Sequence, residues 1–170
     1  RAVRTASAAV DVSHLILLDV LTDEGITGYG EAHPGRSPGA VTSLIHSTIA
    51  PMLVGMQATD VVGAWQRVHR MQLSSHGLGA GASLALSGID MALWDALARV
   101  QNLPLHRLLG GVAKPIRAYG AVGYDGADGC AKGAERWAAR GITGIKAKIG
   151  YPTVQEDIAV VRAVRTAAGP

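Results

Sequence analysis

The sequence predicts an α+β domain over residues 1–112, followed over residues 113–170 by two βα units of a parallel α/β architecture. Before residue 112, two short apolar runs separated by a turn precede three segments with apolar residues at helical spacing. From Lys114 onward the pattern changes to strand, helix, strand and helix with short connections. This alternation is typical of parallel strands that are covered by helices.

A β-hairpin is predicted first. Residues 14–22 form an apolar run of strand length, and residues 26–32 run back after the turn Asp23-Glu24-Gly25. Gly25 suits this turn because glycine adopts the left-handed backbone conformation without steric cost. The segment from His33 to Gly39 contains two prolines and two glycines and is therefore predicted as a loop.

Three helices are predicted between this loop and residue 112. The first is expected to end before Pro51, and its apolar positions are Val41, Leu44, Ile45 and Ile49. The second is capped by Thr59 or Asp60, and its apolar positions are Val61, Val62, Trp65, Val68 and Leu73. The third spans about residues 82–100, and the apolar face consists of Leu86, Ile89, Leu93 and Leu97. Its many alanines and its Ser87-Gly88 pair indicate close packing against a neighbouring element.

Beyond residue 112 we expect strands at 116–122 and 144–149 and helices at about 127–140 and 153–168. A parallel strand is normally buried on both faces, so a sheet of only two such strands would be incomplete. We therefore expect the complete protein to continue after Pro170.

Composition excludes several classes of protein. Hydrophobic residues make up 48% of the chain and charged residues 17%, which favours a buried core over disorder. The net charge is +3, but the basic residues are scattered singly, so nucleic acid is not an expected partner. No uninterrupted apolar run reaches the roughly 20 residues of a membrane helix, so no membrane partner is expected. Cys130 stands alone and cannot form an internal disulfide, which favours a reducing, cytoplasmic setting.

Lys146 and Lys148 are the most informative residues for chemistry. Side chains alternate along a strand, so the two lysines share one face while Ile145, Ala147 and Ile149 share the other. A solvated lysine face on an ordinary amphipathic strand is one interpretation. In a βα barrel, however, the following helix covers the apolar face, and the lysines would point into the barrel at its active-site end.

Two ammonium groups close together disfavour each other's charge, which readies one of them to act as a base. Such a pair suits removal of a proton from a carbon beside a carboxylate, because the charged neighbour can hold the anion. The enolate that results needs stabilisation, for which a divalent metal is the usual means.

Four motifs resemble the mandelate racemase and muconate lactonizing enzyme family of the enolase superfamily, and together they extend over essentially the whole chain. They are GITGYGEA at 25–32, ALSGIDMALWD at 85–95, PLHRLLGG at 104–111 and KAKIGYP at 146–152. The resemblance implies that residues 1–112 are a capping domain. It also implies that residues 113–170 are the first two βα units of a (β/α)8 (TIM-type) barrel, which is incomplete here.

By this resemblance Lys148 is the base or acid on one face of the substrate. Lys146 would lie beside the substrate carboxylate and favour the neutral form of Lys148. The loop from His33 to Gly39 would fold over the barrel mouth, with His33 and Arg36 as substrate-binding candidates; ordinary exposed loop residues are the alternative. The family's Mg²⁺ ligands are expected after residue 170, so no metal ligand is predicted here, and the isolated 170-residue piece is expected to be inactive.

The implied function is metal-assisted abstraction of the proton α to a carboxylate through an enolate, in a racemase of 2-hydroxy acids or a dehydratase of sugar acids. The expected partner is a small-molecule carboxylate, and the expected assembly is a homo-oligomer. Where the mandelate-racemizing branch of the family contacts substrate through a serine, this chain has Ala121. Together with Arg36, whose planar fork matches paired oxygens, this favours a polar 2-hydroxy acid or sugar acid over mandelate.

Two other classes remain open. One is a non-catalytic fragment or interaction module that is stable only against another chain. A stop codon directly after Pro170 would favour it, whereas acidic residues in the next strands would favour the enzyme. The other is a nucleotide-binding α/β protein, which is less favoured because no phosphate-type glycine loop joins the strands after residue 112 to their helices.

Overall fold

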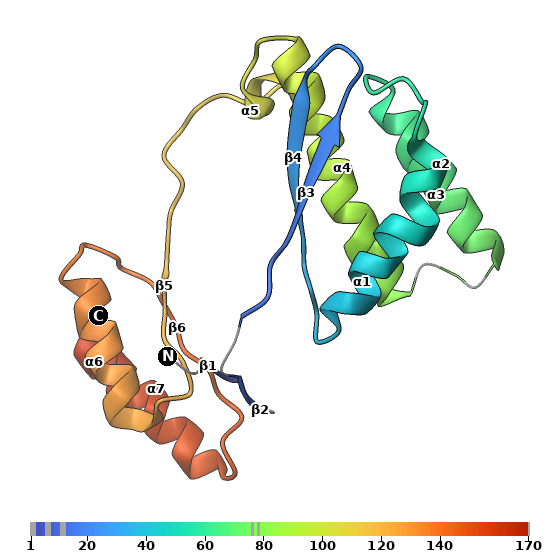
Figure 1. Cartoon of the computed structure of the whole chain (residues 1–170). Helices are drawn as coiled ribbons and strands as arrows, with labels where there is room; N and C mark the ends of the chain where they lie inside the picture. Colours follow the sequence, from blue (N-terminus) through green and yellow to red (C-terminus); the bar gives the residue numbers. More distant parts are fainter. Residues whose placement is uncertain (1–2, 6–7, 11–12, 76, 78, 170) are drawn as a thin grey trace. The chain divides into compact units, whose positions relative to one another are not determined.

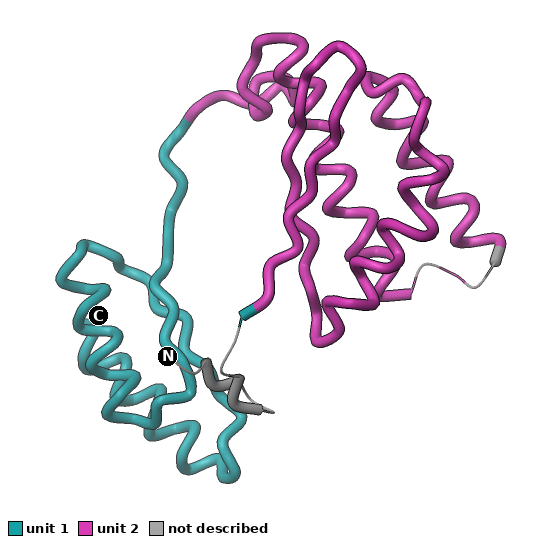
Figure 2. Tube along the Cα trace, viewed as in Figure 1, with its two compact units in different colours: residues 1–13, 114–170 teal, residues 14–113 magenta. Residues whose placement is uncertain are grey.

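The computed structural model describes residues 3–5, 8–10, 13–75, 77 and 79–169. The chain divides into two compact units (Figure 2). One unit comprises His14–Ala113, and the other comprises Arg1–Ser13 together with Lys114–Pro170. The division of the complete protein into domains after residue 112 stays a prediction. Among the described residues, no helix has both the length and the apolar character that crossing a bilayer requires.

The unit of residues 14–113 contains the predicted hairpin, which is confirmed (Figure 1). Strand β3 (Ile16–Leu21) pairs antiparallel with β4 (Thr27–Ala32). Gly25 has φ +78° in the turn, as the prediction required. The Thr22 Oγ1 atom accepts a hydrogen bond of 3.0 Å from the Ile26 N–H, which closes the connection between the strands.

The first helical segment runs past Pro51, so the expectation that this proline ends it is wrong. Helix α1 (Pro38–Leu44) continues through the π-helical turn η1 (Ile45–Ile49) into α2 (Ala50–Leu53). In a regular α-helix the proline ring would clash with the carbonyl four residues earlier. Here the Ala50 N–H bonds to the Ile45 carbonyl, five residues back, so the backbone is wider directly before Pro51.

The two longer helices are α3 (Val61–Ser75) and α4 (Ala80–Val100), and a short helix α5 (Leu105–Leu108) follows them. Asp60 rather than Thr59 caps α3, because its Oδ1 accepts a 3.0 Å hydrogen bond from the Gly63 N–H. Helix α3 buries Val61, Ala64 and Val68. Three of its predicted apolar positions are instead exposed, since only one stripe of the helix meets the core: Val62, Trp65 and Leu73.

Helix α4 lies directly against β4, with Leu86, Ile89 and Leu93 buried in the core of this unit. A Cβ atom added at Gly30 would overlap the Gly88 carbonyl oxygen and lie 2.9 Å from the Ala92 nitrogen. A Cβ added at Gly88 would lie 2.7 Å from the Ala32 Cβ. The strand and helix therefore approach too closely for larger residues, which confirms the close packing predicted at Ser87-Gly88.

Asp95 joins the hairpin to α4 and has a structural role. Its Oδ2 accepts hydrogen bonds from the Tyr29 N–H at 2.9 Å and from the Arg99 Nε at 2.7 Å. Desolvation opposes ionisation, but the hydrogen bonds from Arg99 and the Tyr29 N–H together hold the pKa of the Asp95 carboxyl below its ordinary value. The Arg99 guanidinium also lies 4.9 Å from the centre of the Tyr29 ring.

The other unit contains a short antiparallel pair, β1 (Val3–Thr5) and β2 (Ala8–Val10), which was not predicted. Its remaining elements follow the order β5 (Gly120–Ala121), α6 (Gly126–Ala138), β6 (Ile145–Lys146) and α7 (Val154–Ala168). Strands β5 and β6 pair in parallel, which confirms the predicted direction. Helices α6 and α7 pack on each other over a core of Val122, Cys130, Ala134, Val160 and Val164.

Both parallel strands are shorter than predicted. The expected strand at 116–122 is reduced to residues 120–121, and that at 144–149 to residues 145–146. Among the described residues these two strands pair only with each other. Neither strand has a second neighbour among them, so the strand conformation is limited to the few residues that pair. Ile116 and Tyr119, in the first part of the longer predicted strand, are exposed.

Candidate functional site

The segment from Ile145 to Lys148 has two distinct faces. Ile145 and Ala147 are partly buried and pack against the apolar core under α6 and α7. Lys146 and Lys148 are exposed. The predicted alternation is confirmed for these four residues. It ends at Ile149, which was predicted on the covered face but is 56% exposed. Ile149 lies three residues beyond the end of β6, where no pairing with another described strand holds the chain.

The neighbouring strand places a small side chain beside the lysines. Ala121 is the register partner of Lys146, and the Val122 N–H donates a 3.0 Å hydrogen bond to the Lys146 carbonyl. Side chains of paired residues lie on the same face of a sheet, so Ala121 shares the exposed face with Lys146. Val122 points to the opposite face and is buried. The exposed face therefore carries Lys146 next to an alanine, and Lys148 follows two residues further along the chain.

Helix α6 covers the opposite face of β5 through Trp137. A Cβ atom at Gly120 would overlap the Trp137 ring, so only glycine allows the helix to lie this close. The Trp137 Nε1–H donates a 3.0 Å hydrogen bond to the Ala121 carbonyl. This contact fixes β5 from the covered side and leaves the lysine-bearing face open.

The connections that follow β5 and β6 meet through two tyrosines. The Tyr124 hydroxyl donates to the Ile149 carbonyl, and the Tyr151 hydroxyl accepts a 2.9 Å hydrogen bond from the Gly126 N–H. The two rings lie 5.0 Å apart between centroids. Desolvation raises the pKa of the Tyr151 phenol, while the hydrogen bond from Gly126 opposes the rise.

Asp157 holds the turn that follows Lys148. Its Oδ1 accepts hydrogen bonds of 2.8 Å from the Gly150 N–H and 2.9 Å from the Tyr151 N–H. Helix α7 begins directly after this turn with a capping box between Thr153 and Glu156. Sequence reasoning missed the role of Asp157, although a carboxylate in the first turn of a predicted helix is placed to accept from nearby N–H groups.

His33 and Arg36 lie in the unit of residues 14–113, whereas both lysines belong to the other unit. Both loop residues are exposed. The His33 Nδ1 accepts a 2.9 Å hydrogen bond from the Gly35 N–H, so in the neutral ring Nε2 carries the proton and can donate. Gly35 has φ +57°, and α1 begins at Pro38, one residue before the end of the predicted loop.

The described residues contain no group of three or more His, Cys, Asp or Glu side chains that could hold a metal ion. Mg²⁺ prefers several oxygen ligands in a regular octahedral arrangement. The part of the chain that the structure describes therefore does not form a magnesium site by itself.

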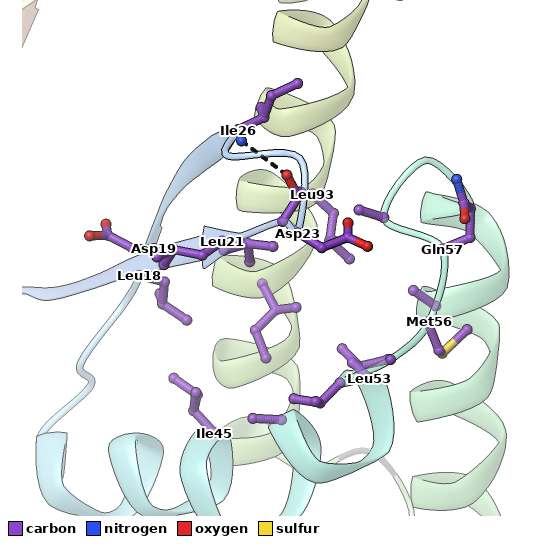
Figure 3. Close-up of a pocket in the computed structure, with 18 of the residues that line it drawn as sticks. Leu18, Asp19, Leu21, Asp23, Ile26, Ile45, Leu53, Met56, Gln57 and Leu93 are labelled. Atoms are coloured by element: carbon purple, nitrogen blue, oxygen red, sulfur yellow. Dashed lines mark hydrogen bonds between the residues drawn. The ribbon is translucent and has the colours of Figure 1, made fainter.

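A cleft of about 750 Å³ lies within the unit of residues 14–113, between β3, the α1–η1–α2 segment and α4 (Figure 3). Its walls combine polar residues with aliphatic ones such as Leu18, Ile45, Leu53 and Leu93. Asp23 adds a carboxylate near the hairpin turn. None of the four predicted site residues lines this cleft, so it is separate from the predicted site.

Comparison with known proteins identifies relatives over nearly the whole chain. The sequence model of the mandelate racemase / muconate lactonizing enzyme N-terminal domain matches residues 1–110. The arabinonate dehydratase of Saccharolobus solfataricus is 29% identical over 91% of this chain and 42% of its own length. The L-Ala-D/L-Glu epimerase of Bacillus subtilis is 28% identical over 98% of this chain and 45% of its own length.

Solved structures show the same likeness. A member of the enolase superfamily from Polaromonas sp. JS666 is 57% identical, with a TM-score of 0.91 over 99% of this chain and 45% of its own. An enolase from alpha proteobacterium bal199, solved with bound Mg, is 29% identical, with a TM-score of 0.89 over 100% of this chain and 48% of its own. The chain thus spans less than half the length of each of these proteins.

Proposed function

We propose that the complete protein removes the proton α to the carboxylate of a small polar acid. The premise is that the chain belongs to the mandelate racemase and muconate lactonizing enzyme family. The observation that carries the proposal is the exposed pair Lys146 and Lys148. Lys146 ends the parallel strand β6, and the alternate residues Ile145 and Ala147 pack on the core under α6 and α7. Relatives that are dehydratases and an epimerase support the same class of reaction.

Lys148 is the proposed base. Its neutral amine takes the α-proton on Nζ, and the electrons of the broken C–H bond move toward the carboxylate to give an enolate. Lys146 is the proposed anion-binding group, because its ammonium charge on the same exposed face attracts the carboxylate. Return of a proton to the opposite face of the same carbon gives racemization. Departure of a hydroxyl from the neighbouring carbon, which takes up a proton and leaves as water, gives dehydration.

The remaining parts of the proposal concern the complete protein. The two βα units of residues 114–169 would open a (β/α)8 barrel, and the unit of residues 14–113 would be its capping domain. Mg²⁺ would stabilise charge on the substrate and would be held by residues outside the described part of this chain, consistent with the Mg bound in one relative. The homo-oligomeric assembly and the cytoplasmic location stay predictions.

A polar 2-hydroxy acid or sugar acid is the proposed substrate class. Ala121 beside Lys146 offers no hydroxyl to the substrate, whereas His33 Nε2 and the Arg36 guanidinium are donors on an exposed loop. Donors of this kind recognise hydroxyl-rich or carboxylate-bearing molecules. A site built to pair with such groups rejects an analogue that lacks them, because its polar atoms would be left unpaired.

A substrate screen tests this proposal. The complete protein with Mg²⁺ is expected to act on at least one aldonic or aldaric acid with a kcat/KM at least about 100-fold above that for mandelate. Products and α-proton exchange in D2O are followed by NMR over a panel of sugar acids and 2-hydroxy acids. Efficient racemization of mandelate with no activity on any sugar acid would contradict the proposed substrate class. The base assignment to Lys148 would be unaffected by that outcome.

A further inference from the structure

We propose that Tyr124 is a positioning residue for Lys148, an inference that rests on the proposed role of Lys148 as the base. The Tyr124 hydroxyl donates to the carbonyl of Ile149, the residue that directly follows Lys148. Tyr124 comes from the connection between β5 and α6, so this hydrogen bond joins the lysine-bearing segment to the neighbouring strand's loop.

Lys148 needs such support because it lies beyond the paired part of the sheet. Strand β6 ends at Lys146, whose carbonyl accepts from the Val122 N–H at 3.0 Å. Beyond Lys146, the Ile149 carbonyl accepts the next hydrogen bond from the β5 side, and its donor is the Tyr124 hydroxyl. The backbone of Lys148 is therefore held between two donors, Val122 and Tyr124, which both follow β5.

The position of the Tyr124 side chain is itself fixed. Its ring lies 5.0 Å from the ring of Tyr151, and the Tyr151 hydroxyl accepts from the Gly126 N–H at 2.9 Å. Asp157 holds the same turn from the α7 side through the N–H groups of Gly150 and Tyr151. The turn after Lys148 is thus held from the α7 side by Asp157 and from the β5–α6 side by Tyr124 and Gly126. Of these, only the Tyr124 hydrogen bond reaches the residue that directly follows Lys148.

This arrangement matters for proton abstraction because the lysine side chain is long and has several rotatable bonds. A base must approach the α-carbon within a narrow range of distance and direction, and a displacement of about 1 Å can cost roughly 100-fold in rate. Fixing the backbone on both sides of Lys148 fixes the origin of its side chain. Binding of the carboxylate by Lys146, on the paired part of the strand, depends much less on Tyr124.

The variant Tyr124→Phe tests the proposal because it keeps the ring against Tyr151 and removes only the hydroxyl donor. In the complete protein with Mg²⁺, we expect the kcat for α-proton exchange on the Lys148 face to fall about 10- to 100-fold, with KM nearly unchanged. Exchange on the opposite face should keep its rate. The matched control is Tyr119→Phe, which changes an exposed tyrosine one residue before β5 and should leave both rates unchanged.

Amide hydrogen exchange gives a second measurement that needs no turnover. In Tyr124→Phe the amides of Gly150 and Tyr151 should exchange faster, while those of α6 keep their protection. Unchanged protection, an unchanged kcat, or equal losses on both faces of the substrate would overturn the proposal. If Lys148→Ala left exchange intact, the proposed base would be wrong. Faster exchange confined to Gly150 and Tyr151 would still show that Tyr124 holds this turn.

Discussion

Lys148→Ala in the complete protein is expected to lower the rate of α-proton exchange at one face of the substrate by about 1,000-fold. The reason is that the alanine variant has lost the amine that is proposed to accept the proton at this face. Exchange at the opposite face, served by a base from another part of the protein, should survive. The measurement is incorporation of deuterium from D2O into each enantiomer of the substrate, followed by NMR.

Two matched variants separate this effect from simple loss of charge. Lys132→Ala removes an exposed lysine of α6 in the same unit and should leave both exchange rates unchanged. Lys146→Ala should instead raise KM for the carboxylate substrate, because the charge that binds the anion is lost. Wild-type exchange at both faces in Lys148→Ala would show that another residue is the base.

Gly30→Val is expected to destabilise the unit of residues 14–113 by about 3 kcal/mol. Any Cβ at this position overlaps the Gly88 carbonyl oxygen, and backbone atoms cannot move aside as the end of a flexible side chain can. Such a loss is a large fraction of the stability of an ordinary domain. The measurement is urea denaturation of the complete protein, followed by circular dichroism.

Gly39→Ala is the matched control. Gly39 lies in helix α1, and a Cβ added there meets no atom within 4 Å. Alanine should therefore be neutral or slightly stabilising, because it restricts the unfolded chain and favours the helix. If Gly30→Val unfolded at the wild-type urea concentration, the close packing of β4 on α4 would not be a determinant of the fold.

Local patterns in the sequence predicted the parts of the fold that local chemistry determines. The hairpin followed from two apolar runs around Gly25, whose positive φ the structure confirms. The face of α4 followed from the spacing of Leu86, Ile89 and Leu93, all of which are buried. The two faces of the lysine strand followed from the period of two residues along a strand.

Sequence patterns did not predict features that depend on the surrounding structure. Pro51 was expected to end a helix, but a π-helical turn before it makes room for the ring. Ile149 was assigned to the covered face by alternation, yet the chain leaves the strand before it. The hydrogen bond between Tyr124 and Ile149 joins residues 25 positions apart, and no spacing rule connects them.

The central claim is that Lys146 and Lys148 face the substrate, and a crystal structure of the complete protein with a bound 2-hydroxy acid and Mg²⁺ tests it most directly. The prediction is that the Lys148 Nζ lies about 3 to 3.5 Å from the α-carbon, the distance from which a proton can be taken. The Lys146 Nζ should lie beside the carboxylate. A bound substrate whose α-carbon is remote from Lys148, with both lysines in bulk solvent, would contradict the assignment.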